Sequence, residues 1–269
     1  MHPGDGYAIS AATQGVCTPF PCDAGPASMS AHPTGFDFAP LAALANPAAL
    51  HALLAWTSPA YPTGAYSYSH GLEWAVEEGS VRDVAGVVEY VDAVLSRGSG
   101  WIDAVLFAHA HACAHDTAAF DAVAELAAAF RGSSEGALES HQQGAAFLSV
   151  TRRAWPHPAL EDFFMRIGAY PVAHSIAMAL ACAAHGIACR LALPAWLHST
   201  AANLVSAAVR LIPLGQTDGQ IAIARLGPTI DRVACAAMQT PLDDLGTASP
   251  LLDICSIRHE TQYTRLFRS

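Results

Sequence analysis

Apolar residues recur at helical spacing from residue 41 to the end of the chain, and this pattern constrains the fold more than any other feature. The clearest run lies between residues 84 and 95, where aliphatic side chains fall on one helix face: Val84, Val87, Val88, Val91 and Leu95. No alternating apolar and polar pattern of useful strand length occurs in the sequence. We therefore predict an all-α fold, a single-domain bundle of about eight to ten helices.

Proline and glycine mark the expected ends of these helices, because both residues favour turns and interrupt helical hydrogen bonding. Pro47, next to Asn46, is placed to start the first helix. After Phe163 the chain reads as helical almost to Gln239, with interruptions expected at Gly186, Pro194, Pro213-Leu214-Gly215 and Gly227-Pro228.

Residues 1–40 differ from the rest, because they are rich in Gly, Pro, Ser, Thr and Ala and lack apolar periodicity. We predict that they form a disordered N-terminal segment and that residues 41–269 form the helical domain. Met1 to Ala31 lack the basic and apolar regions of a secretory signal. The seven cysteines are odd in number and widely spread, so we interpret them as reduced thiols and expect a cytoplasmic protein.

The overall charge argues against nucleic acid as a partner. The chain has 23 acidic and 13 basic residues, and phosphate binding needs clustered Lys and Arg.

Two segments without charged residues, Ala169–Cys189 and Leu191–Val209, approach the roughly 20 residues that span a bilayer. Both are rich in alanine and contain histidine and hydroxyl side chains, so we predict buried helices and no membrane contact.

Known catalytic motifs are missing from the sequence. There is no phosphate-binding loop, no dinucleotide fingerprint and no Gly-x-Ser-x-Gly elbow. His259-Glu260 begins like a zinc-protease motif, but Tyr263 stands where the second histidine is needed. We therefore expect no catalytic residue, no cofactor and no enzymatic activity.

Histidines gather at one place in the sequence, at His109, His111 and His115, together with Cys113. On a helix, His111 and His115 share one face, and such a pair can seat a divalent ion such as nickel. The alternative is a set of ordinary surface histidines on an alanine-rich helix.

The last twelve residues, Arg258 to Ser269, are called the C-terminal tail below. They carry three arginines against one acidic residue, in a chain whose formal net charge is −10. Arginine and aromatic side chains such as Tyr263 and Phe267 are enriched where proteins bury surface against each other. The tail is thus either a docking element with exposed anchors or a last helical turn folded onto its own core.

Three segments together resemble the UreF family of urease accessory proteins. They are Ser58-Pro59-Ala60-Tyr61-Pro62-Thr63-Gly64-Ala65-Tyr66-Ser67-Tyr68-Ser69-His70-Gly71-Leu72-Glu73, then Arg210-Leu211-Ile212-Pro213-Leu214-Gly215-Gln216-Thr217-Asp218-Gly219-Gln220, and the C-terminal tail. The likeness runs from about Pro47 to the last residue. It does not include residues 1–40 or the histidine cluster.

The resemblance implies a non-catalytic homodimer that binds the accessory protein UreD (also called UreH) and engages the GTPase UreG. Such complexes deliver nickel to apo-urease in a step driven by GTP hydrolysis. The tail looks like the segment that becomes ordered on binding UreD, and Tyr66 and Arg265 look like positions important for UreG.

The polar side chains of Tyr66, His70 and Glu73 cluster where a helix begins, and Gln216 follows a helix break; each segment is either a partner-binding patch or a capped structural turn. Together with the resemblance, they predict a partner-binding surface that draws on all three segments. Its residues are Tyr66, Ser67, His70, Glu73, Gln216, Arg258, His259, Glu260, Gln262, Tyr263, Arg265, Leu266, Phe267 and Arg268. The rival hypothesis is a metallochaperone that binds nickel directly through His111 and His115.

Overall fold

A computed structural model describes residues 46–168 and 170–269, so the predicted disordered segment 1–40 lies outside the described residues. Within these ranges the chain forms eleven α-helices, two short 3₁₀ helices and no strand. In chain order they are α2 (Pro47–Trp56), η1 (Ala65–Ser67), α3 (Leu72–Glu77), α4 (Val84–Arg97), α5 (Ser99–Ala112), α6 (Thr117–Ala129), α7 (Ser134–Ala154), α8 (Pro158–Ile167), α9 (His174–Ala184), α10 (Cys189–Leu211), α11 (Gln216–Ala237), η2 (Leu242–Asp244) and α12 (Pro250–Glu260). The predicted all-α class is confirmed, with slightly more helices in the described part than we expected.

Local sequence explains where several helices begin. The Asn46 side chain accepts a hydrogen bond from the backbone N–H of Ala48 at 3.0 Å, and Pro47 is the first residue of α2. Asp83 caps α4 by accepting from the N–H of Gly86 at 2.9 Å. These caps satisfy N–H groups that have no partner inside a helix.

Two of the expected interruptions are wrong, because Pro194 lies inside α10 and Pro228 lies inside α11. Each proline removes one helical hydrogen bond. Both helices nevertheless continue, since each buries a long apolar face: Leu193 and Leu197 on α10 are fully buried, as is Leu226 on α11. Tertiary packing here outweighs the local preference of proline.

The alanine-rich helix α9 forms the centre of the molecule, in contact with α5, α7, α8 and α10. Residues 175–182 of α9 are all buried, as the sequence predicted for this uncharged segment. Large side chains such as Phe107 and Phe147 fill the space around the small alanines. None of the described helices is long and apolar enough to cross a membrane.

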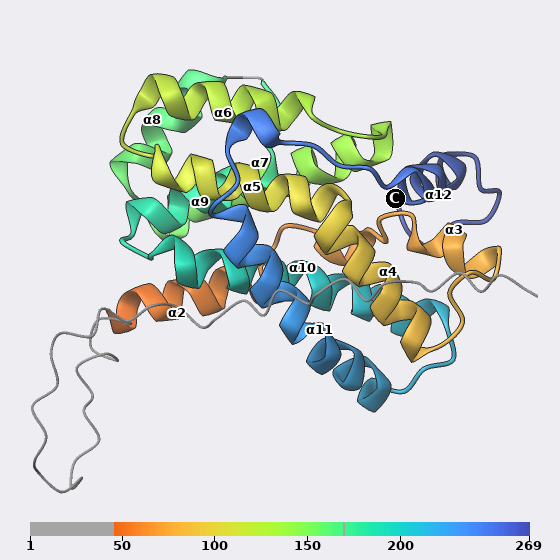
Figure 1. Cartoon of the computed structure of the whole chain (residues 1–269). Helices are drawn as coiled ribbons and strands as arrows, with labels where there is room; N and C mark the ends of the chain where they lie inside the picture. The colour runs from red at the N-terminus through yellow and green to blue at the C-terminus, as the bar shows by residue number, and fades with distance from the viewer. Residues whose placement is uncertain (1–45, 169) are drawn as a thin grey trace, which may run out of the picture.

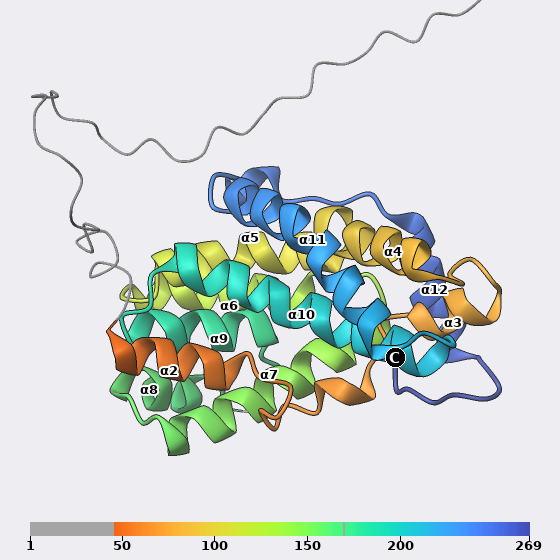
Figure 2. The same cartoon turned by 90° about the horizontal axis from the view of Figure 1, so that it is seen from below.

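The two ends of the molecule are built from different elements. Figures 1 and 2 show α3, α12 and the last residues of the chain at one end, and α2 and α8 at the other. Helix α12 packs against α3 and α7. This arrangement places the C-terminal tail beside the segment from Tyr66 to Glu73, although the two are far apart in the sequence.

Candidate functional site

The C-terminal tail is folded against the body of its own chain. The backbone N–H of Arg268 donates to the carbonyl of Ser67 at 2.8 Å, and the N–H of Ser69 donates to the carbonyl of Ser269 at 2.7 Å. The Ser69 hydroxyl donates to the same carbonyl. Both Ser69 and Ser269 are buried by this pairing. The end of the tail is thus fastened to the segment that leads from η1 into α3.

A buried carboxylate on α3 receives the middle of the tail. The two oxygens of Glu73 accept hydrogen bonds from the backbone N–H groups of Leu266 at 2.6 Å and Phe267 at 2.9 Å. A buried carboxylate needs such donors, because it has lost its hydration. Hydrogen bonds to an ionised acceptor are also stronger than neutral ones. Glu73 therefore fixes the path of the tail backbone.

His259, on the last turn of α12, connects Glu73 to a second helix. Its Nε2 lies 3.1 Å from Glu73, and its Nδ1 lies 2.7 Å from Glu135 at the start of α7. The imidazole is 0% exposed. The imidazole of His259 thus bridges the carboxylates of two different helices, α3 and α7.

The second oxygen of Glu135 accepts from the Arg265 guanidinium at 2.8 Å. Glu73 and Glu135 are therefore both hydrogen-bonded, as buried carboxylates require. We call Glu73, Glu135, His259 and Arg265 the tail clamp.

The tail held by the clamp has buried side chains, called its inner residues, and exposed side chains, called its outer residues. Phe267 is only 4% exposed, and the Arg210 guanidinium lies 4.4 Å from the centre of its ring. The expectation that Phe267 is an exposed anchor is therefore wrong. Tyr263 and Leu266 instead face solvent, with exposed fractions of 103% and 64%. The tail thus contains one aromatic side chain folded onto the core and two apolar side chains exposed to solvent.

The predicted patch around Tyr66 adjoins the tail. The Tyr66 side chain is exposed, and its backbone carbonyl accepts from the same Arg210 guanidinium that covers Phe267, at 2.9 Å. Arg265 keeps about two fifths of its side chain exposed, at 39%, while it pairs with Glu135. Tyr66, Leu266 and Tyr263 thus form the outward-facing apolar groups at this end.

The other predicted site residues of the tail are held in different ways. The buried Gln262 donates to Glu77, and Glu260 accepts from the Ser134 hydroxyl. Arg268 is exposed and donates to Gln142 at 3.3 Å. Arg258 is exposed as well, and it has no ion pair among the described residues.

Gln216 does not join this cluster by any contact. It is exposed at the first residue of α11, and its side chain makes no hydrogen bond within the described part of the chain.

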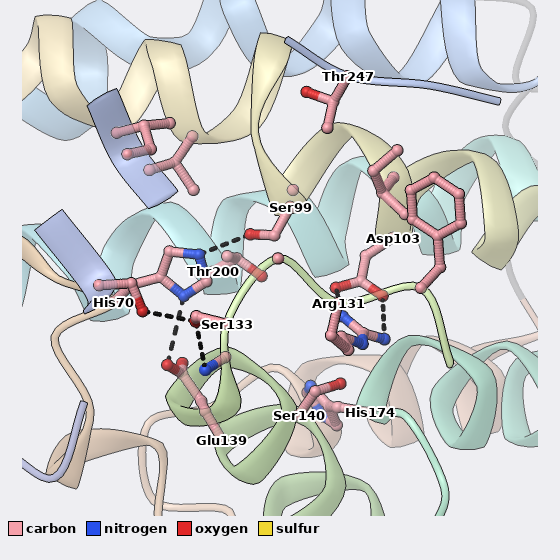
Figure 3. A pocket seen from close by; sticks show the side chains of 18 of the residues that line it. His70, Ser99, Asp103, Arg131, Ser133, Glu139, Ser140, His174, Thr200 and Thr247 are labelled. Carbon is pink, nitrogen blue, oxygen red and sulfur yellow. Dashed lines mark hydrogen bonds and ion pairs between the residues drawn. The ribbon is translucent and has the colours of Figure 1, made fainter. Parts of the chain in front are cut away.

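A cavity of about 390 Å³ lies next to the clamp, and His70 lines it. Figure 3 shows His70 between Ser99 and Glu139. Its Nε2 lies 2.6 Å from the Ser99 hydroxyl, and its Nδ1 lies 3.3 Å from the Glu139 carboxylate. Burial lowers the pKa of His70, but the Glu139 carboxylate outweighs burial, so the net shift is upward.

On the opposite wall of the cavity, Arg131 and Asp103 form a bidentate ion pair with distances of 2.8 and 2.9 Å. Burial raises the pKa of Asp103, but Arg131 and a hydrogen bond from Ser175 bring the net shift below the usual value. Burial lowers the pKa of His174 to about 4, so this ring is neutral. Its Nε2 is the one cavity-wall nitrogen that is buried without a hydrogen-bond partner in the described structure.

The tail adjoins the cavity through Glu139, a cavity-wall residue that the last residue of the chain contacts. The Ser269 hydroxyl donates to Glu139 at 2.7 Å, and α12 contributes Leu252, Asp253 and Ser256 to the cavity wall. Gly71, with φ +77°, allows α12 to come close, because a Cβ there would meet the Ser256 nitrogen at 2.8 Å.

Helix α12 also exposes apolar residues that the sequence analysis did not select. Leu251, Ile254 and Ile257 are 76%, 48% and 50% exposed. They recur every three residues, so they lie along the outer side of the helix, whereas Cys255 and His259 are buried. The apolar pattern of α12 does not predict which side of the helix is exposed, because apolar residues occur on both sides.

The histidine cluster on α5 has a structural use. His109 donates to the carbonyl of Thr240 and His111 to that of Ile187, each at 2.8 Å. Burial lowers the pKa of His111. The prediction that His111 and His115 share one helix face is wrong, because α5 ends at Ala112 and His115 lies beyond it. The described residues contain no group of three or more side chains arranged to hold a metal ion.

Comparison with known proteins gives a consistent result. The sequence matches the UreF family profile over residues 81–227. It is 50% identical over 235 residues to "Urease accessory protein UreF" of Granulibacter bethesdensis (strain ATCC BAA-1260 / CGDNIH1), covering 87% of this chain and 99% of that relative. It is 46% identical over 224 residues to the protein of the same name from Rhodopseudomonas palustris (strain TIE-1), covering 82% and 93%. For the protein of that name from Methylobacterium sp. (strain 4-46), the identity is 48% over 219 residues, covering 81% and 87%.

Proposed function

The chain belongs to the UreF family of urease accessory proteins, and from this premise we propose that it is a non-catalytic assembly factor of urease maturation. In this proposal it acts in the cytoplasm as a homodimer. It binds UreD (UreH), engages the GTPase UreG through that complex, and promotes GTP-dependent insertion of nickel into apo-urease.

One observation carries the docking part of the proposal: the clamp holds the tail while Tyr263 and Leu266 point into solvent. A segment fixed before binding loses less conformational entropy when a partner covers it. Each side chain can contribute about 1.5–3 kcal/mol when a partner buries it fully. We therefore assign the UreD contact to Tyr263 and Leu266 and give Phe267 the role of internal anchor.

The outer side of α12 extends the same surface. Leu251, Ile254 and Ile257 continue the apolar character of the tail along the helix that leads into it. Large exposed apolar patches on a protein surface mark sites of association. In the proposal, UreD covers this stripe together with the outer residues of the tail.

Tyr66 and Arg265 supply the proposed contact with UreG. Tyr66 is exposed beside the buried end of the tail, and Arg265 has donors left over from its ion pair with Glu135. Aromatic and arginine side chains are the types that most often dominate binding energy at interfaces. Because Tyr66 lies next to the tail and Arg265 lies within it, UreD binding and UreG binding can support each other.

The docking proposal is tested with the double variant Tyr263→Ala/Leu266→Ala. Its matched control is Met165→Ala/Ile221→Ala, which also removes two exposed apolar side chains but lies outside the tail. We expect the tail variant to lose at least about tenfold in affinity for a purified UreD-like protein by calorimetry, with unchanged helical circular dichroism. Equal affinities of the two double variants would contradict the docking role.

The non-catalytic role has a separate test. The purified chain should not hydrolyse GTP alone, whereas a mixture with UreD-like and UreG-like proteins should do so and load apo-urease with nickel. GTP hydrolysis by the chain in the absence of UreG would overturn this part of the proposal.

A further inference from the structure

A second open surface lies between α6 and α8. The space between these helices forms a groove of about 500 Å³, closed at one side by the segment Tyr170–Pro171–Val172. Helix α8 is at the end of the molecule away from α12 in both views (Figures 1 and 2). No residue of the tail or of its clamp lines the groove, although Ala129 lies on the walls of both the groove and the cavity. Its volume is in the range that accommodates one or more large side chains of a ligand.

The groove stays open because α6 presents small side chains to it. Ala124 and Ala128, one helical turn apart, line its α6 wall. The floor is formed by Phe163, which is 1% exposed and packs edge-on against Phe120 with ring centres 5.0 Å apart. Val172 is buried beside it. The floor is thus apolar and fixed by the core, and the two alanines of α6 leave space above it.

The charged side chains that line the groove, Asp121, Glu125 and Arg166, leave it with a net negative charge. Helices α6 and α8 carry four acidic side chains, at Asp121, Glu125, Glu161 and Asp162, and one basic side chain, at Arg166. Arg166 binds both oxygens of Asp121 at 3.0 Å and so is already neutralised.

Glu161 is paired with Arg152 of α7. Glu125, on the groove wall itself, has no ion pair among the described residues. The rim therefore offers an uncompensated negative charge beside an apolar floor.

We propose that this groove docks a basic amphipathic segment of a partner protein, one that inserts an aliphatic or aromatic side chain and places Lys or Arg beside Glu125. An apolar groove with a charged rim is the receptor geometry for an amphipathic helix. The apolar insertion supplies affinity, and the sign of the rim selects against acidic segments. This surface is a second one, and it does not depend on the docking role of the tail.

The test uses two synthetic helical peptides, one of leucine and lysine and one of leucine and glutamate, in fluorescence anisotropy with the full chain. The Leu/Lys peptide should bind, and the Leu/Glu peptide should bind at least about tenfold more weakly. Ala128→Phe fills the groove and should weaken binding about tenfold or more, whereas Ala122→Phe, at an exposed site of α6 outside the groove, should not.

The role of charge is isolated with Glu125→Lys against Glu89→Lys, an equal charge change on an exposed site of α4. Only Glu125→Lys should weaken binding of the Leu/Lys peptide. The proposal is overturned if the Leu/Lys peptide does not bind. It is also overturned if Ala128→Phe and Ala122→Phe bind this peptide with equal affinity, or if Glu125→Lys and Glu89→Lys do so. Binding of the tail variant Tyr263→Ala/Leu266→Ala should equal that of the wild type, which separates this proposal from the docking of UreD.

Discussion

The tail end and the central helix α9 are held together by different forces. Around α9 most contacts are apolar, and their strength depends on how well the small alanines of the helix fit against large rings such as Phe147. At the tail end, a few charged and polar groups hold a segment that buries only one large apolar side chain, Phe267. This difference means that the stability of the core depends on the volume of its side chains. The position of the tail depends instead on single hydrogen-bonding partners.

The largest expected effect lies at the apolar centre. Phe147→Ala removes a fully buried ring in contact with Trp56 and His174, and it should lower the free energy of unfolding by about 3–5 kcal/mol. Urea denaturation followed by circular dichroism measures this loss. A change below about 1 kcal/mol would show that packing around α9 is looser than described.

The next effect is a pH dependence of stability that arises from His174. Its pKa is about 4 in the folded chain and 6.5 in the unfolded reference, so the unfolded state binds more protons between these values. Stability is therefore unaffected by this group above pH 6.5 and falls as the pH is lowered toward 4, by up to about 3 kcal/mol.

His174→Gln should remove this part of the pH dependence in urea titrations at several pH values. The control His198→Gln, at an exposed site of α10, should keep the wild-type slope. Identical slopes for both variants would show that His174 accepts a proton as readily in the folded chain as in the unfolded one.

A smaller effect on stability is expected where α12 packs against Gly71. Gly71→Ala adds a Cβ that meets the α12 backbone and also forces an alanine to φ +77°, so it should cost about 2–3 kcal/mol. Gly186→Ala is the matched control, since it has φ +69° but no atom within 4 Å of the added carbon, and it should cost about 1 kcal/mol. Thermal unfolding compares the two variants. Equal losses would mean that α12 is not packed closely on Gly71.

The smallest effect is expected for the outer residues of the tail. Tyr263→Ala/Leu266→Ala removes side chains that the chain itself does not bury, so its free energy of unfolding should stay within about 0.5 kcal/mol of the wild type. Denaturation by urea checks this value. A loss comparable with that of Phe147→Ala would place these residues in the core and contradict the division of the tail.

Much of the fold could be predicted from the sequence, because its signals are local. The apolar spacing of Val84, Val87 and Leu95 and the cap at Asp83 define α4 without reference to any other part of the chain. The helix ends predicted at Pro194 and Pro228 are wrong, since the packing that stabilises α10 and α11 across these prolines comes from neighbouring helices.

The site was predicted less completely, because its contacts join distant positions. Glu73 and His259 were selected through a family resemblance, but Glu135, Glu139 and Arg210 carry no local signal of their role. The residue types alone do not show that Phe267 is buried and Leu266 is exposed. Only the path of the backbone, set by Glu73, decides which of them points inward.

The most direct test of the clamped tail is amide hydrogen exchange along its backbone in the free protein. The account predicts slow exchange at Leu266 and Phe267, whose N–H groups donate to Glu73, and fast exchange at Tyr263 and Thr264. Glu73→Ala should bring all four amides to the fast rate. Exchange at Leu266 and Phe267 as fast as in an unstructured peptide, already in the wild type, would contradict it.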